Sequence, residues 1–183
     1  METLAANQTI TKWVLDPSHS ELNFRVKHLM ISNVKGEFRK FTAEIDGEDF
    51  TNSQIKVTID SSSIYTNDDS RDGHLKAADF FDVENHKEIL FTGSSFKKVD
   101  DANYKLIGQL TIKGVSNAVT LDVEFGGFNK DPWGNEKAAF SLSGKFNRKD
   151  WGLDWNAALE TGGVLVSDEV RIQAEVQFVK QAQ

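Results

Sequence analysis

Residues 21–28 read Glu-Leu-Asn-Phe-Arg-Val-Lys-His, and this stretch sets the pattern for most of the chain. Leu22, Phe24, Val26 and His28 fall on one side of an extended strand, whereas the residues between them are polar or charged. Because side chains alternate across a β-strand, this spacing predicts a strand with one buried and one wet face. The same period of two recurs at residues 41–45, 54–60, 104–112, 119–125, 140–146 and 170–179.

With shorter apolar stretches near residues 13–15 and 86–92, the chain has about eight strands, and their alternation favours antiparallel pairing. A closed up-and-down barrel and a two-sheet sandwich both satisfy this pattern, but only the closed barrel leaves no strand edge exposed. Gly93, Gly108 and Gly144 stand among bulky residues on the inward faces. We expect these glycines to leave space inside the barrel for one ligand.

Residues 71–81, Arg-Asp-Gly-His-Leu-Lys-Ala-Ala-Asp-Phe-Phe, are the segment that favours a helix. Asp68, Asp69 and Ser70 precede it, and these residue types begin helices. Gly73 costs about 1 kcal/mol relative to alanine inside a helix, so we expect the helix to be short or frayed at its start. A lone helix in an all-β chain must cover an open barrel end or one face of a sheet.

The composition limits the class of protein. A chain of 183 residues predicts one domain, which we place at residues 11–181 after a flexible tail at residues 1–10. The net charge of −7 argues against non-specific binding to nucleic acid or to an anionic membrane, because both need a basic surface. The absence of cysteine excludes disulfides and cysteine-based metal sites.

The sequence also bears on location. No apolar stretch approaches the ~20 residues that span a bilayer, so we expect no stable membrane insertion. Residues 1–13 carry neither a basic region nor an apolar run of the kind found in secretory signals. As written, the sequence predicts a cytoplasmic protein, or a periplasmic one if a leader has been removed.

Several motifs resemble one known family in order and spacing. They are W-V-L-D-P-S-H-S-E-L-N-F-R-V-K-H from Trp13, V-K-G-E-F from Val34, S-I-Y-T-N-D-D-S-R-D-G-H-L-K-A-A-D-F-F-D from Ser63, G-Q-L-T-I-K-G-V-S-N-A-V-T-L from Gly108, F-N-R-K-D-W-G-L from Phe146 and D-E-V-R-I-Q-A-E-V from Asp168. Together they run from Trp13 to about Val179, and they are similar to the YceI-like family of polyisoprenoid-binding proteins.

This resemblance implies an all-β, lipocalin-like, eight-stranded antiparallel β-barrel with a short inserted helix. It also implies an elongated apolar pocket that holds a polyisoprenoid or an isoprenoid quinone, with no other cofactor. The sequence departs from the family pattern at Trp151, where phenylalanine is usual, and at His86-Lys87, where proline is common. Either change can alter the shape of the pocket without changing the fold.

The expected function is non-enzymatic binding, storage or transport of such a hydrophobic small molecule, with no metal site and no catalytic residue. Residues on inward strand faces and on the helix are the expected ligand contacts. They are Phe24, Val26, His28, Phe38, Arg71, His74, Phe80, Phe81, Phe91, Leu110, Ile112, Val123, Phe140, Leu142, Phe146 and Trp151. The helix and residues 129–136 are the candidate gates, and a homodimer through an exposed strand face is expected by analogy alone.

Two other functions stay open at this point. An enzyme acting on a lipid-like substrate inside the barrel would use His28 or His74 as a general base. A protein-interaction module would fill the barrel with the same apolar residues and have no cavity. For His28 the plainer interpretation is a ring that bonds a backbone carbonyl at the barrel end. For Arg71-Asp72 and Arg148-Asp150 it is a structural ion pair or a cap. The alternative is that either arginine holds a phosphate or quinone oxygen at the mouth.

Overall fold

The computed structural model describes residues 11–156 and 166–181, so the tail predicted at residues 1–10 lies outside the described residues. The strands are β1 (Lys12–Leu15), β2 (Glu21–His28), β3 (Ser32–Phe38), β4 (Phe41–Asp46), β5 (Gln54–Asp60), β6 (Ile64–Tyr65), β7 (Glu88–Lys98), β8 (Asn103–Ile112), β9 (Val115–Lys130), β10 (Glu136–Asn147) and β11 (Val166–Lys180). The helix is α1 (Asp69–Lys76), and single 3-10 turns are η1 (Pro17–His19), η2 (Phe50–Asn52), η3 (Ser61–Ser63) and η4 (Arg148–Trp151).

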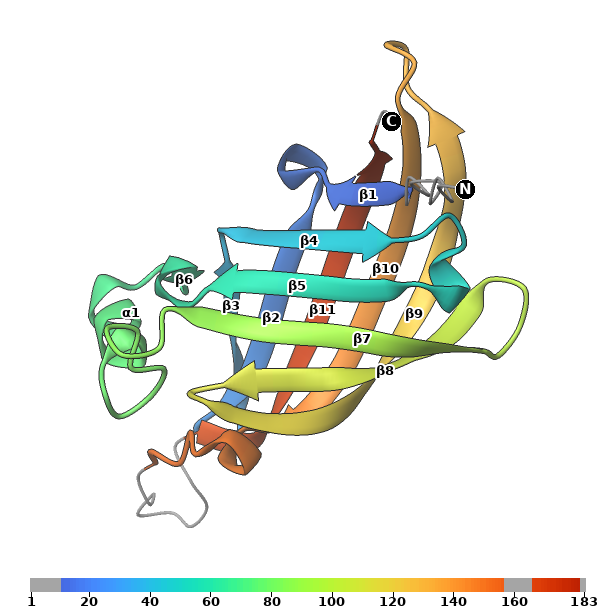
Figure 1. Cartoon of the computed structure of the whole chain (residues 1–183). Coiled ribbons are helices and arrows are strands. Elements are labelled where there is room, and N and C mark those ends of the chain that lie inside the picture. The colour runs from blue at the N-terminus through green and yellow to red at the C-terminus, as the bar shows by residue number, and fades with distance from the viewer. Residues whose placement is uncertain (1–10, 157–165, 182–183) are drawn as a thin grey trace, which may run out of the picture.

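The strands close into one antiparallel ring, which confirms the predicted eight-stranded barrel (Figure 1). The order is β1-β4-β5-β7-β8-β9-β10-β11, and β11 pairs back onto β1. β11 also pairs with β2, so β1 and β2 share the position beside it. β4 and β3 share the next position, and β5 and β6 share the one after.

One end of the barrel is closed by aromatic side chains. Phe50, in η2, lies 4.9 Å from Phe125, 5.1 Å from Phe140, 5.4 Å from Tyr104 and 5.5 Å from Phe96, measured between ring centroids. Pairs at these distances add to the burial of the rings themselves. α1 lies at the opposite end of the barrel (Figure 1), and its residues, unlike Phe50, line the interior cavity.

The helix ends earlier than the sequence predicted. α1 begins firmly, because Asp68 accepts a hydrogen bond from the backbone N–H of Arg71, but it stops at Lys76, and Ala77 is extended at ψ 170°. Phe80 is only 7% exposed and Phe81 is half-buried. The backbone N–H of Phe81 donates to the carbonyl of Leu75 at 3.0 Å, and that of Val83 donates to the carbonyl of Lys76 at 3.1 Å, so the last carbonyls of the helix are satisfied without a further helical turn. The helix is short, as the glycine at position 73 led us to expect, with eight residues, and its start is capped rather than frayed.

The inward glycines were expected to leave space inside the barrel, and this expectation is wrong. A Cβ added to Gly108 would lie 2.7 Å from the ring of Phe91, and one added to Gly144 would lie 2.7 Å from Leu121. At Gly93 the neighbour is Leu106, at 2.9 Å. These glycines accept neighbouring side chains instead of leaving space beside them.

Candidate ligand-binding cavity

The barrel holds a cavity of about 560 Å³, inside the usual range of small-molecule pockets of about 300–1,000 Å³. Its walls are the inward faces of the strands together with α1, the turn after it and η4. The lining includes every side chain that the sequence proposed as a ligand contact. The filled barrel expected for an interaction module is therefore not what the structure has.

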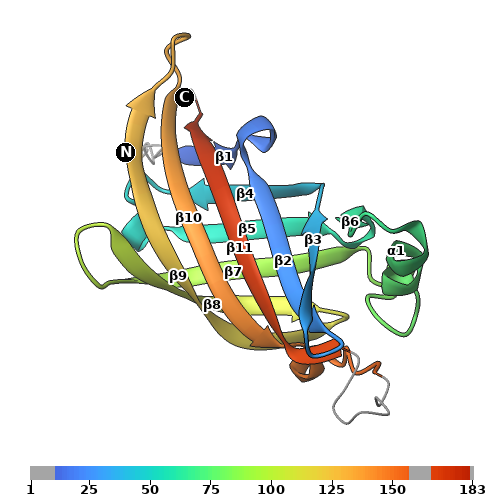
Figure 2. The same ribbon diagram turned by 180° about the vertical axis from the view of Figure 1, so that it is seen from behind.

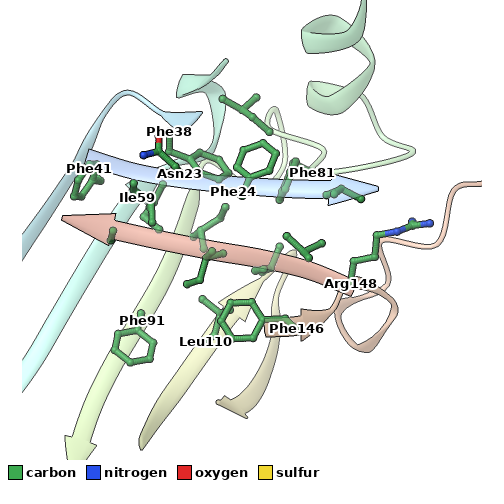
Figure 3. A pocket seen from close by; sticks show the side chains of 18 of the residues that line it. Asn23, Phe24, Phe38, Phe41, Ile59, Phe81, Phe91, Leu110, Phe146 and Arg148 are labelled. Carbon is green, nitrogen blue, oxygen red and sulfur yellow. The ribbon is translucent and has the colours of Figure 1, made fainter. Parts of the chain in front are cut away.

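Aromatic rings join β2 and β3 to the turn after α1. Phe38 lies 5.6 Å from Phe24 and 5.9 Å from Phe81, measured between ring centroids, and Figure 3 shows the three together. Phe24 can occupy this place because Gly36 faces it across the strand pair, where a Cβ would come within 2.3 Å of its ring. These rings form an apolar wall between the helix and the strands.

A second aromatic group forms the rim beside α1. His74 lies 4.7 Å from Trp155 and 5.1 Å from Phe80, and Trp155 lies 5.7 Å from Phe80. All three side chains line the cavity. Sequence reasoning missed Trp155, because residues 147–155 form a corner without any period. Its tryptophan-rich composition was the available clue.

The helix is fastened through Thr66. The buried carboxylate of Asp72 accepts hydrogen bonds from the backbone N–H of Thr66 at 2.9 Å and from its hydroxyl at 2.5 Å. Arg71 donates from Nε to the same hydroxyl at 2.8 Å and from Nη2 to the carbonyl of Thr66 at 2.7 Å. The expected ion pair between Arg71 and Asp72 is therefore replaced by a shared anchor. Within the described residues, Nη1 of Arg71 keeps no hydrogen-bond partner, and the residue lines the cavity.

Arg148 is structural rather than free for a ligand. Its side chain is 4% exposed and donates to the carbonyls of Leu153, Trp155 (2.9 Å), Val166 (3.4 Å) and Ser167 (3.0 Å). Its nearest carboxylate is Asp168 at 3.9 Å, so the expected pair with Asp150 is wrong. Burial lowers the pKa of Arg148 from its ordinary value, against the opposing effect of Asp168. Through these bonds Arg148 links the corner that follows β10 with the start of β11.

His28 and His74, the two candidate general bases, differ in their surroundings. The ring of His28 lines the cavity and has no hydrogen bond to the described residues. His74 has a carboxylate nearby, since its Nε2 lies 3.7 Å from Asp79. No three metal-ligating side chains come together among residues 11–156 and 166–181.

His19 belongs to a small exposed cluster outside the cavity. Its Nδ1 lies 2.8 Å from Asp16 and 3.0 Å from the hydroxyl of Ser18. A hydrolytic triad needs the two partners on opposite ring nitrogens, so this arrangement does not activate the serine. The hydroxyl of Ser20, the residue after His19, instead accepts a hydrogen bond from the backbone N–H of Gln177 at 3.1 Å.

Of the two candidate gates, the helix lines the cavity and the loop at residues 129–136 does not. Residues 129–136 lie at the β9–β10 hairpin, far from α1, and none of them lines the cavity, so this gate is not supported (Figure 1). Leu75, Phe80 and Phe81 of the helical gate do line the cavity, whereas Ala78 is exposed. None of the helices in the described part of the chain is long and apolar enough to cross a membrane.

Comparison with known proteins agrees with this geometry. A family model for the YceI-like domain matches residues 13–178. A UPF0312 protein of Staphylococcus aureus is 40% identical over 172 residues, which cover 92% of this chain and 98% of the relative. The crystal structure of the Campylobacter jejuni YceI protein is 36% identical with a TM-score of 0.72, covering 86% of this chain and 90% of that one. A polyisoprenoid-binding domain from Saccharophagus degradans shares the fold at 15% identity and a TM-score of 0.67, covering 92% of this chain and 98% of that one. The chain therefore belongs to the YceI-like family.

Proposed function

We propose that this protein binds and carries, without catalysis, a long-chain isoprenoid lipid or a quinone-like amphiphile. The observation that carries the proposal is the cavity of about 560 Å³, whose strand walls are almost wholly apolar. Burying each CH₂ of a ligand there is worth about 0.8 kcal/mol, before the costs of ordering the chain. The Saccharophagus degradans domain of the same fold, described as polyisoprenoid-binding, gives further support.

The polar groups of the lining favour an amphiphile over a plain hydrocarbon. Thr66, Asp68, Ser70, Arg71 and His74 gather on and before α1, at the end opposite the Phe50 plug. A ligand oxygen placed there could accept a hydrogen bond from Nη1 of Arg71, which has no partner among the described residues, and a guanidinium is a good donor to such oxygens. Arg148 takes no part, because backbone carbonyls already occupy its donors.

The test is organic extraction of the purified protein followed by mass spectrometry. The proposal expects a prenyl lipid or quinone in about one copy per chain. Repeated extractions without any such lipid, together with no uptake of added prenyl alcohol, would contradict it. Turnover of that lipid by wild-type protein, lost in His28→Ala or His74→Ala while binding persists, would favour the enzyme instead.

A further inference from the structure

The register of the sheet gathers four cations on the outer wall. Lys145 of β10 lies opposite Arg171 of β11, Arg171 lies opposite Arg25 of β2, and Arg25 lies opposite Lys35 of β3. All four are exposed, and their neighbours along each strand line the cavity, so the four point outward. Figure 2 shows these strands side by side on one face. We call the four residues the basic row.

The basic row is poorly neutralised. Like charges directly opposite each other on a sheet are destabilising. Arg171 pairs with Glu169 at 2.9 Å, but no carboxylate of the described residues forms an ion pair with Lys145, Arg25 or Lys35. A free protein with net charge −7 thus keeps a local band of positive charge that an anionic surface would relieve.

An apolar tip lies at the end of the same wall. Leu29, Met30 and Ile31 form the turn between β2 and β3, with 41%, 51% and 86% of their surface exposed. No acidic residue occurs between Lys27 and Lys35, the two exposed lysines that flank this turn. We call residues 29–31 the hairpin tip.

The hairpin tip adjoins the cavity. His28, the residue before the tip, and Val166, its partner on β11, both line the cavity. Arg25 is four residues from Leu29, or about 13 Å along the strand. An apolar tip, a band of cations and an end of the cavity therefore occupy one side of the barrel.

We propose that the hairpin tip and the basic row dock this protein peripherally on an anionic lipid bilayer. Apolar insertion and attraction to anionic lipids are the two contributions that hold proteins at membrane surfaces, and clusters of four or more cations are typical of such sites. A nucleic acid or an acidic protein would use the cations but not three adjacent exposed apolar residues. The proposal concerns surface binding and involves no spanning segment. Its use in loading a ligand rests on the proposed function, whereas the docking itself does not.

The test is flotation with vesicles of phosphatidylcholine alone or of phosphatidylcholine and phosphatidylglycerol in equal parts. Wild-type protein is expected to float with the anionic vesicles and much less with the neutral ones. Arg25→Gln plus Lys35→Gln should weaken this binding at least tenfold, since each cation near the surface is worth about fivefold. Leu29→Ser, Met30→Ser and Ile31→Ser together should weaken binding to a similar extent.

Matched controls come from other parts of the barrel. Lys97 and Lys105 also lie opposite each other, on β7 and β8, but Asp122 pairs with Lys105. Lys97→Gln plus Lys105→Gln removes the same charge, and Trp133→Ser removes an apolar side chain that is 84% exposed at the β9–β10 hairpin. Both controls should bind vesicles as the wild type does.

Several results would overturn the proposal. They are equal binding to both vesicle types, equal losses in the controls, or tighter binding to an oligonucleotide or polyglutamate than to anionic vesicles. Circular dichroism of each variant separates loss of docking from unfolding. Protein that docks but yields no lipid on extraction and takes up no added prenyl alcohol would leave the docking intact and refute the proposed ligand. Lipid-loaded protein that does not bind vesicles would refute the docking and leave the proposed ligand intact.

Discussion

At the scale of single residues, Gly108 shows how the cavity wall is packed. A Cβ at this position would lie 2.4 Å from the carbonyl oxygen of Thr92 and 2.7 Å from the ring of Phe91. We expect Gly108→Ala to lower the free energy of unfolding by about 1–3 kcal/mol, because overpacking forces the ring or the strand to move. Urea denaturation measures this loss. An unchanged midpoint would show that the ring or the strand moves aside without cost.

Asp16 predicts a dependence of stability on pH. The hydrogen bond from Ser18, joined by contacts with His19 and Lys137, lowers the pKa of Asp16 far below its ordinary value, against the opposing effect of partial burial. An acid whose pKa is depressed in the folded state adds stability above its unfolded pKa of about 3.9, and this stability is lost as the pH falls below it.

The substitution Asp16→Asn isolates this charge, because the amide oxygen can still accept the hydrogen bond from the backbone N–H of Ser18. We expect it to cost about 1 kcal/mol at pH 7 and progressively less below pH 4. Urea denaturation of both proteins across this range gives the difference. A difference that stays constant down to pH 3 would mean that the charge of Asp16 is not involved.

At the scale of elements, most strands were predictable and the end of the helix was not. Most strands are specified by their own alternation, as in residues 21–28, but β3 and the two-residue β6 were not among the predicted strands. The stop at Lys76 goes with turn hydrogen bonds, such as that from the N–H of Phe81 to the carbonyl of Leu75, which no period in the sequence marks. The packing role of the inward glycines and the basic row depend on cross-strand register, which no single stretch of sequence contains.

The helix itself gives a matched test of glycine. A Cβ added to Gly73 meets nothing within 4 Å, and the residue is exposed. We expect Gly73→Ala to raise the free energy of unfolding by about 0.5–1 kcal/mol, the difference in helix propensity. Urea denaturation beside Gly108→Ala makes the comparison, and destabilisation by both alanines would contradict the open site at Gly73.

The turn after α1 is expected to retain the ligand. Phe80 and Phe81 both line the cavity, so Phe80→Ala plus Phe81→Ala should lower the amount of co-purifying lipid several-fold. Ala77→Ser plus Ala78→Ser changes exposed positions of the same turn and serves as the control. Lipid content by extraction is the measurement, with circular dichroism to verify folding. A folded double alanine variant that keeps its lipid fully would exclude a role for this turn as a lid.

At the scale of the whole molecule, ring closure and the cavity are linked. Eight strand positions give an interior that side chains can fill or that can hold one ligand. Here the Phe50 plug fills one end, while α1, Trp155 and the turn after the helix line the other. The eight positions of the ring could be predicted from the sequence, but the choice between a filled and a hollow barrel could not. That choice depends on where each ring turns, as where the ring of Phe24 lies over Gly36 of the neighbouring strand.

A hollow barrel predicts that ligand and stability are coupled. Protein stripped of lipid should gain about 2.7 kcal/mol when a prenyl alcohol such as geranylgeraniol is present at a hundred times its dissociation constant, which corresponds to a rise in Tm of about 5–10 °C. Ala43 is buried and lines the cavity, whereas its neighbour Thr42 is exposed. Ala43→Phe should therefore abolish most of the shift by occupying the cavity, and Thr42→Phe should preserve it. Calorimetry of the three proteins with and without the alcohol makes the comparison, and an equal shift in Ala43→Phe would place the ligand outside the barrel.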